Sequence, residues 1–294
     1  MASAADAPLR LRLGTRTSPL ARAQVAIVAA ALSRLGLALE VEEVGITSRG
    51  DVSRAPFASF QGPGIFTREL ESALEVGKID AAVHSMKDLP ASVRRDFVLF
   101  CLPRGEARDA VITRPGVKIT ELAAKSRVGT SSARRAAYIR HSFPHLEVVP
   151  VRGNVDTRLR KLDMGDVDAL VLAAAGIQRL GRQVTLDLLD PEVMLPAPAQ
   201  GVIAVETVPG SVAASVLARL DDARTRLATT AERTFLAAFG QGCQLPIGAY
   251  ARLEGEEIHL TGGVFENGAY HEKSGSGPDP EELGTRLAQE IRAS

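Results

Sequence analysis

Short apolar runs alternate with longer stretches of helical periodicity from Leu9 onward. The run from Leu9 to Gly14 predicts a strand. Ser18-Pro19 then predicts the start of a helix, because a hydroxyl suits the N-cap and proline suits the first turn. The segment Gly77-Lys78-Ile79-Asp80-Ala81-Ala82-Val83 is typical of a turn that enters a buried strand. Strands that alternate with helices predict mostly parallel sheets with helices on both faces.

Two short patterns recur later in the chain in the same order. Leu13-Gly14-Thr15 matches Val128-Gly129-Thr130, and hydroxyl residues and a predicted helix follow both. Gly77-Lys78-Ile79-Asp80-Ala81 matches Gly165-Asp166-Val167-Asp168-Ala169, and an apolar strand follows both. The shared order predicts two α/β domains of similar plan. Ligands of such folds bind at the carboxyl ends of strands, near helix N-termini.

Two segments predict crossings between these domains. Phe97 to Pro103 leaves the first domain, and Leu195 to Gly201 returns to it, so that the strand from Val202 to Glu206 rejoins the first domain. From Asp222 a helix and three alternating strands predict a small α+β domain. The expected boundaries are residues 1–101 with 200–218 for the first domain, 102–199 for the second and 222–294 for the third.

Bulk composition excludes several classes of protein. The chain is 45% hydrophobic and 24% charged, and its net charge is zero, so no overall field attracts nucleic acid or a membrane. Two distant cysteines predict a reducing compartment, and an N-terminus without an apolar signal core predicts the cytoplasm. Pro144 separates His141 from His145, so the histidines show no metal spacing. Neutrality and the absence of heptads favour a monomer.

Positive charge is concentrated locally. Between Lys125 and Lys161 there are nine Lys or Arg residues and two acids. Arg134 and Arg135 fall in the first turn of the helix that follows Ser131 and Ser132, where amides, hydroxyls and guanidiniums would converge on an anion. Arg152 and Arg158 add cations after another expected strand. In the first domain the equivalent loop offers Arg16 and Ser18.

Four interpretations of this basic segment compete. A solvated basic face is the usual meaning of a charge run. Nucleic acid is disfavoured, because only Tyr138 and Phe143 offer stacking surface there. The glycine-hydroxyl loops lack the P-loop pattern, which disfavours nucleoside triphosphates. A small ligand that bears several carboxylates fits best.

Two further residues are candidates for chemistry. Cys243 lies in Gly240-Gln241-Gly242-Cys243-Gln244-Leu245-Pro246-Ile247-Gly248, a glycine-flanked loop, and its thiol is either reactive or structural. Asp88 lies in His84-Ser85-Met86-Lys87-Asp88-Leu89-Pro90, at the end of the strand from Ile79 to Val83. It is either an ion-pair partner that closes a turn or a carboxylate that passes a proton and stabilises a cation.

Together these motifs resemble the porphobilinogen deaminase (hydroxymethylbilane synthase) family, in order and over nearly the whole chain. The resemblance is carried by Arg16-Thr17-Ser18-Pro19-Leu20-Ala21, His84 to Pro90, Gly129-Thr130-Ser131-Ser132-Ala133-Arg134-Arg135, Arg152-Gly153-Asn154-Val155 and Gly242 to Gly248. It implies two domains like type II periplasmic binding proteins and a small α+β C-terminal domain. It also implies a dipyrromethane cofactor, bound through a thioether to Cys243 and retained as a primer.

The resemblance implies a role for each site residue. Asp88 would be the catalytic carboxylate. The acetate and propionate groups of the cofactor would be held by Lys87, Ser131, Ser132, Arg134, Arg135 and Arg158. The incoming or growing pyrrole chain would be held by Arg16, Ser18, Arg152 and Arg179.

The implied reaction is the deamination and head-to-tail condensation of four porphobilinogen molecules, with release of the linear tetrapyrrole hydroxymethylbilane. The alternative is a cytoplasmic two-domain binding protein for a small polycarboxylate. Two departures from the family pattern stand out. Pro63 replaces a lysine common in the expected active-site lid, and Ala199 replaces a glycine before Gln200-Gly201. If residue 199 adopts a positive φ, alanine there carries a modest strain.

Overall fold

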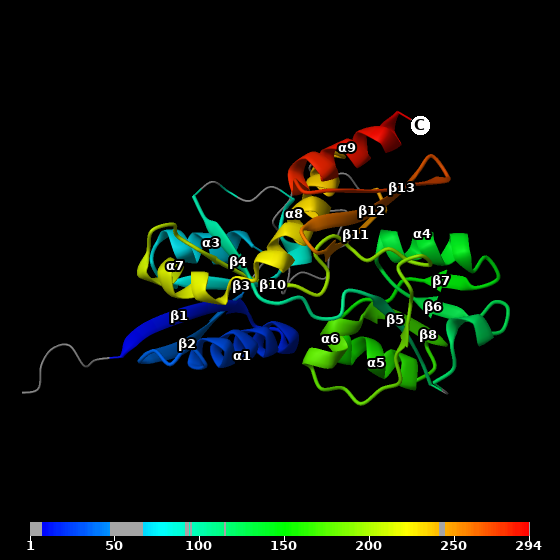
Figure 1. The fold of residues 1–294 in the computed structure, drawn as a ribbon. Coiled ribbons are helices and arrows are strands. Elements are labelled where there is room, and N and C mark those ends of the chain that lie inside the picture. Colours follow the sequence, from blue (N-terminus) through cyan, green and yellow to red (C-terminus); the bar gives the residue numbers. More distant parts are fainter. Residues whose placement is uncertain are drawn as a thin grey trace, which may run out of the picture. The chain divides into compact units, whose positions relative to one another are not determined.

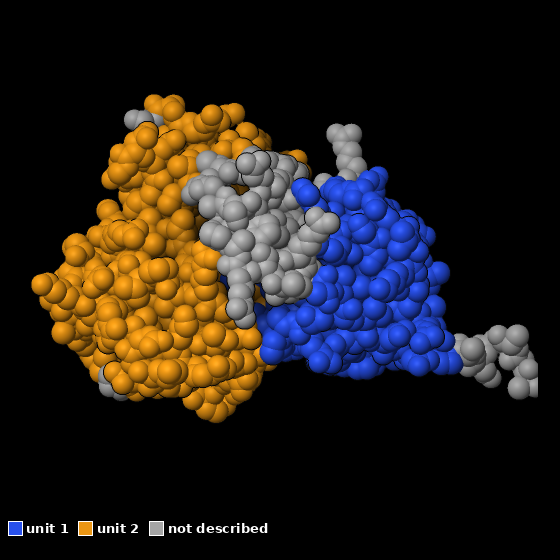
Figure 2. Space-filling view, turned by 180° about the vertical axis from the view of Figure 1, so that it is seen from behind, with its two compact units in different colours: residues 1–104, 202–226 blue, residues 105–201, 227–294 orange. Residues whose placement is uncertain are grey.

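The computed structural model describes residues 8–47, 67–91, 94, 96–114, 116–240 and 245–293. The chain forms two compact units, which Figure 2 distinguishes by colour. Unit 1 comprises residues 1–104 and 202–226, and unit 2 comprises residues 105–201 and 227–294. Unit 2 contains two of the three sheets, and the three-domain boundaries expected from the sequence remain a proposal.

The sheet of unit 1 has five strands in the order β2-β1-β3-β10-β4 (Figure 1). Its strands are β1 (Leu9–Arg16), β2 (Leu39–Ile46), β3 (Ala81–Ser85), β4 (Val98–Cys101) and β10 (Ile203–Thr207). β1 pairs in parallel with β2 and β3, whereas β10 is antiparallel to β3 and β4. The helical segments are α1 (Pro19–Ser33), α3 (Arg68–Glu75), η2 (Met86–Asp88), α7 (Val212–Leu217) and η4 (Ala218–Leu220).

The first sheet of unit 2 repeats this plan, in the order β7-β6-β8-β5-β9. Its strands are β5 (Asp109–Thr113), β6 (Arg127–Gly129), β7 (Glu147–Val149), β8 (Ala169–Ala173) and β9 (Asp187–Leu188). β6 is parallel to β7 and β8, and β5 is antiparallel to β8 and β9. The helical segments are η3 (Ile119–Glu121), α4 (Ala133–Ser142), α5 (Val155–Asp163) and α6 (Ala174–Arg179). The expected pair of similar α/β sheets is confirmed.

An arginine–aspartate pair is duplicated along with the sheets. Asp80 accepts hydrogen bonds from the backbone N–H and the guanidinium of Arg12 at 2.7–3.0 Å. Asp168 accepts the same set from Arg127 at 2.7–3.2 Å. Each aspartate N–H also donates to the carbonyl of its arginine at 2.9 Å. The pair ties an arginine of one parallel strand, Arg12 within β1 or Arg127 at the start of β6, to the turn before the neighbouring strand. This contact explains why both sequence repeats carry an aspartate.

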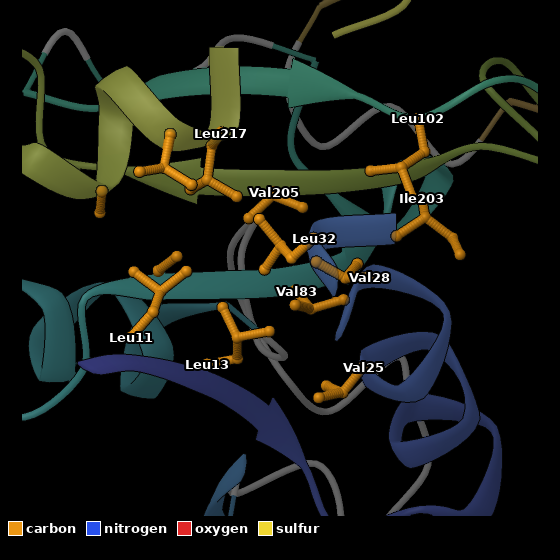
Figure 3. Close-up of a cluster of buried hydrophobic side chains, with 13 residues drawn as sticks. Leu11, Leu13, Val25, Val28, Leu32, Val83, Leu102, Ile203, Val205 and Leu217 are labelled. Atoms are coloured by element: carbon orange, nitrogen blue, oxygen red, sulfur yellow. The ribbon is translucent and has the colours of Figure 1, made fainter. Parts of the chain in front are cut away.

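Helix α1 covers one face of the unit 1 sheet. Its start is fixed by Ser18, whose hydroxyl accepts a hydrogen bond from the N–H of Ala21 at 3.3 Å, with proline in the first turn. Figure 3 shows its apolar face against the sheet, where the buried side chains include Val25, Val28, Leu32, Leu11, Leu13, Val83 and Val205. Burial of these side chains supplies the main stabilisation of this layer.

The third sheet has the order β11-β12-β13, with antiparallel pairing throughout. Its strands are β11 (Ile247–Glu254), β12 (Glu257–Glu266) and β13 (Ala269–Gly277), and its helices are α8 (Ala223–Ala237) and α9 (Pro280–Arg292). The buried ring of Phe235 on α8 lies so close to Gly262 that a Cβ there would come within 2.4 Å of it. Asp279 caps α9, because its carboxylate accepts hydrogen bonds from the N–H groups of Glu281 and Glu282 at 2.9 Å.

The segment before β10 carries the strain anticipated at Ala199. Ala199 is buried and has a φ of 62°, a conformation that glycine adopts more easily. Its N–H donates to the buried carboxylate of Glu232 on α8 at 2.6 Å, and the other oxygen of that carboxylate accepts from Ala251 at 2.7 Å. Glu232 therefore fastens this segment to β11 and holds the strained residue in place.

The Arg12–Asp80 pair makes stability depend on pH. Burial acts to raise the pKa of Asp80, but the hydrogen bonds and charge of Arg12 outweigh it and leave the pKa below its usual value. A lowered folded-state pKa gives stability that is present above the unfolded pKa of about 3.9 and is lost as pH falls through the folded value. Asp80→Asn should lower the unfolding free energy at pH 7 by about 1 kcal/mol, and the difference should vanish in acid.

Urea unfolding between pH 3 and pH 7 measures this dependence. Asp163→Asn, at an exposed aspartate of α5, is the control and should change the unfolding free energy by less than about 0.5 kcal/mol. A difference between Asp80→Asn and the unaltered protein that stays constant over this pH range would contradict the assignment.

Candidate functional site

A pocket of about 430 Å³, partly open to solvent, lies at the carboxyl ends of β1 and β3 in unit 1. This is the edge of an α/β sheet at which ligands bind. The pocket is lined by Arg16, Ser18, Leu20, Ala21, Gln24, Thr67, Val83, His84, Ser85 and Asp88. The structure therefore brings together Arg16, Ser18 and Asp88, which the sequence placed on separate motifs.

Strand and helix ends position these three side chains. Arg16 is the last residue of β1, Ser18 is the N-cap of α1, and Asp88 ends the short helix η2 that follows β3. The N–H of Met86 donates to the carbonyl of Val202 at 3.0 Å, which anchors η2 to the strand beside it. The carboxylate of Asp88 is exposed and available to a ligand. Lys87 is partly buried and does not line the pocket.

Two polar contacts in the pocket wall were missed by the sequence analysis. Gln24 is buried, and its side-chain amide donates to the hydroxyl of Ser85 at 2.7 Å. His84 and Glu206 form a buried pair, with 3.2 Å between Nε2 and Oε2. Glu206 lies on β10, more than a hundred residues from the His84 motif, so no local pattern could join them.

In unit 2 the loop after β6 presents hydroxyl groups at the start of α4. Ser132 is the N-cap and accepts a hydrogen bond from the N–H of Arg135 at 3.4 Å. Ser131 is exposed, and its hydroxyl donates to the carbonyl of Val151 at 2.9 Å. Ser131 still has its lone pairs available, and the helix start favours an anion nearby.

Arg134 and Arg135, however, are buried and paired with Asp109. Asp109 is fully buried, and its two oxygens lie 2.6 Å from Nη2 of Arg134 and 2.8 Å from Nη2 of Arg135. Gln200 donates to the same carboxylate at 3.0 Å. Arg134 also donates to the carbonyl of Leu195, and Arg135 to that of Val171. The two arginines thus hold β5, β8 and the 195–201 segment together. Their predicted contact with a ligand remains a prediction.

Arg158 and Arg179 have the opposite character. Within the described part of the chain neither has a carboxylate partner: Arg158 donates to the carbonyl of Gly153 at 2.7 Å and Arg179 to that of Gly201 at 2.5 Å. Burial and the nearby charge of Arg135 lower the pKa of Arg158, and burial lowers that of Arg179. A cation held out of water without a counter-charge favours an anionic ligand. Arg152, nearby in the sequence, is exposed.

Comparison with protein-family models decides the identity of the fold. Residues 11–212 match the model for the porphobilinogen deaminase dipyromethane cofactor binding domain, and residues 226–293 match that for the porphobilinogen deaminase C-terminal domain. The chain belongs to the porphobilinogen deaminase family. The sequence motifs that carry the resemblance all lie within these two matches.

Relatives of known name cover nearly the full length. A porphobilinogen deaminase of Roseiflexus castenholzii is 45% identical over 288 residues, which is 96% of this chain and 95% of the relative. That of Mycobacterium tuberculosis is 50% identical over 260 residues, 87% of this chain and 82% of the relative. Among solved structures, the methionine-binding protein MetQ matches with a TM-score of 0.42 and 14% identity, covering 78% of this chain and 94% of that one.

Several residues that the sequence analysis assigns to the site of this porphobilinogen deaminase family member lie outside the described residues. These are Cys243, Pro63 and the rest of the expected lid. The other cysteine, Cys101, is buried, and its sulfur lies 3.8 Å from that of Met86. In the described ranges no cluster of three metal-binding side chains is present, and no helix there has the length and apolarity needed to cross a membrane.

The contrast between the two kinds of arginine is testable. Arg158→Leu removes a desolvated cation that has no acidic partner, so the ligand-free protein should keep or raise its unfolding free energy. Asp109→Asn leaves two buried guanidiniums without a counter-charge and should lower it by about 3–5 kcal/mol. Urea unfolding of pyrrole-free protein gives both values.

The exposed Arg252–Glu254 pair provides the control. Glu254→Gln should change the unfolding free energy by less than about 1 kcal/mol. Destabilisation by Arg158→Leu as large as that of Asp109→Asn would show that Arg158 serves the fold and not a ligand.

Proposed function

We propose that the chain catalyses the deamination and head-to-tail condensation of four porphobilinogen molecules and releases hydroxymethylbilane. The observation that carries the proposal is the pocket at the ends of β1 and β3, where the exposed carboxylate of Asp88 lies among Arg16, Ser18 and Ser85 in a chain of this family. Reaction in the cytoplasm, by a monomer, without nucleic acid or membrane, is part of the same proposal.

Asp88 is proposed as the catalytic carboxylate. Porphobilinogen carries an aminomethyl group, and its departure as ammonia leaves an electron-poor methylene-pyrrole. An ionised carboxylate at this position stabilises such a cation and can hold or deliver the proton that the leaving amine needs. Because Asp88 is exposed at the end of a strand rather than paired in the sheet, its carboxylate is free to serve a ligand.

Arg16, Ser18, Arg152 and Arg179 are proposed to hold the carboxylates of the substrate and of the growing chain. Arg16 and Ser18 lie in the pocket itself, and Ser18 adds the positive end of α1. Each ring brings an acetate and a propionate, so two cations or a cation and hydroxyl groups are needed for each. The lowered pKa of Arg179, caused by burial, supports a role for this residue in anion binding.

The residues of unit 2 fit the dipyrromethane cofactor that this family uses. When bound, the cofactor supplies the terminal pyrrole ring to which the first substrate is joined. The proposed holders of its carboxylates in unit 2 are Ser131, Ser132, Arg134, Arg135 and Arg158, and Lys87 of unit 1 is proposed with them. Arg158 supports the fit most clearly, because its charge has no acidic partner among the described residues. Arg134 and Arg135 would act from the cluster around Asp109, which fixes their position.

Cys243 is proposed to carry the cofactor through a thioether. In sequence it lies between α8 and β11, and it is the second of only two cysteines. The first, Cys101, is buried on β4 against Met86 and cannot serve without opening the sheet of unit 1. The proposal therefore rests on the family resemblance and on the exclusion of Cys101.

Cys243→Ser should purify without bound pyrroles and without activity. The intact mass of the unaltered protein should exceed that of its sequence by two linked pyrrole units, and the variant should show its sequence mass alone. Cys101→Ala is the matched control and should keep the excess mass. Equal mass excess in the unaltered protein and in Cys243→Ser would rule out attachment at this thiol.

Asp88→Asn keeps the shape of the side chain and removes its charge, so the fold should survive. Loss of one acid–base group costs about a hundredfold to ten-thousandfold in rate, and here one carboxylate serves both proton transfer and cation stabilisation. Single-turnover release of ammonia from porphobilinogen by cofactor-loaded protein measures the loss.

Asp96→Asn, at an exposed aspartate that pairs with Arg94, is the control and should keep the full rate. If Asp88→Asn retains a rate within tenfold of the unaltered protein, Asp88 only closes a turn.

A further inference from the structure

The buried pair of His84 and Glu206 has no part in the function proposed so far. The side chains are 4% and 3% exposed, and Nε2 lies 3.2 Å from Oε2. Within the described ranges neither side chain has another hydrogen bond or ion pair. A carboxylate this deeply buried is costly unless a partner compensates it. The Nε2–Oε2 contact is a hydrogen bond through which the imidazole and the carboxyl group can exchange a proton.

The pair is placed by the register of two neighbouring strands. β3 and β10 are antiparallel, with His84 opposite Ala204 and Ala82 opposite Glu206. His84 and Glu206 are therefore diagonal neighbours on one face of the sheet. His84 also lines the pocket that contains Asp88, whereas Glu206 does not line it.

The second sheet of the same plan shows what the fold needs at these two positions. There β8 corresponds to β3 and β5 corresponds to β10, with Leu172 opposite Ala110 and Leu170 opposite Ile112. Leu172 thus occupies the position of the histidine and Ile112 that of the glutamate. Both are buried in one apolar cluster.

This comparison separates structural from functional need. Replacing a buried ion pair by well-packed apolar residues is often neutral or stabilising. The sheet of unit 2 folds with leucine and isoleucine at these positions, so the plan itself does not require charge. The ionisable pair is present in the sheet whose pocket contains Asp88, and there it extends into the pocket wall.

The elements around the pocket that His84 lines carry other charged groups. Arg16 at the end of β1 and Asp88 at the end of η2 line the same pocket, and the polar residue that α1 contributes to it, Gln24, is uncharged. α3 carries the buried Glu71, whose carboxylate pairs with the guanidinium of Arg94 at 3.6 Å. Of these groups, Asp88 is the one assigned to proton transfer.

We propose that the His84–Glu206 pair takes part, together with Asp88, in proton transfer during the reaction. This inference rests on the proposed function. Glu206 is the positioning residue that orients the imidazole, and His84 exchanges a proton with Asp88. The substrate enters as an ammonium ion, and its C–N bond breaks with the electron pair on nitrogen. The proton released when the C–C bond then forms passes through Asp88 to His84, which gives it up to solvent, where it combines with the ammonia that has left. Each cycle yields one ammonium ion and restores the pair.

The double variant His84→Leu/Glu206→Ile copies the second sheet and tests the proposal. It should unfold at the same or a higher urea concentration than the unaltered protein and should bind porphobilinogen with similar affinity. Single-turnover ammonia release should fall at least tenfold at pH 7, and its pH profile should change shape. His259→Leu, which removes a histidine from the exposed pair with Glu254, is the matched control and should change none of these.

Glu206→Gln keeps the shape of the site and provides the second variant if the double variant does not fold. Its rate should also fall, and the imidazole ¹⁵N resonances of His84, which should shift when porphobilinogen binds to the unaltered protein, should respond differently. A rate within twofold of the unaltered protein in the double variant, or in Glu206→Gln if the double variant does not fold, overturns the proposal. If the unaltered protein itself releases no ammonia, the proposed function fails instead.

Discussion

Parallel pairing of β1 with β3, and of β6 with β8, determines where this chain can place its chemistry. In each sheet the loops that follow the two parallel strands meet at one edge, and a helix begins there. The duplicated arginine–aspartate pair secures the turns that enter β3 and β8, at the opposite ends of those strands. The pocket with Asp88 and the hydroxyl-bearing start of α4 are consequences of this one arrangement.

Carboxylate partners divide the arginines of the chain into two groups. Arg134 and Arg135 are buried with Asp109 and hold strands and the 195–201 segment together. Arg158 and Arg179 donate only to backbone carbonyls among the described contacts, and burial lowers the pKa of each. A ligand with several carboxylates would supply the missing counter-charge. The sequence shows the same residue type in both groups, and only the fold distinguishes them.

The sequence predicted the features that depend on local pattern. The repeated Gly–Thr and Gly-x-x-Asp-Ala segments predicted two similar sheets, and Ser18 is a helix cap, as the Ser18-Pro19 pair indicated. Asp109, Gln200 and Glu206 were missed, because each acts on residues distant in sequence. The positive φ of Ala199 was anticipated only as a condition, and the buried carboxylate of Glu232 that holds it came from another element.

The two sheets share one plan but differ in chemistry. An ionisable pair lies beside the pocket in one sheet, and apolar side chains occupy the same positions in the other.

The central claim is that this chain converts its ligand and does not merely bind it. The most direct test is the stoichiometry of turnover with purified protein and porphobilinogen. The account predicts four ammonia molecules for each linear tetrapyrrole released. Recovery of unchanged porphobilinogen from a stable complex would contradict it and would indicate a binding protein.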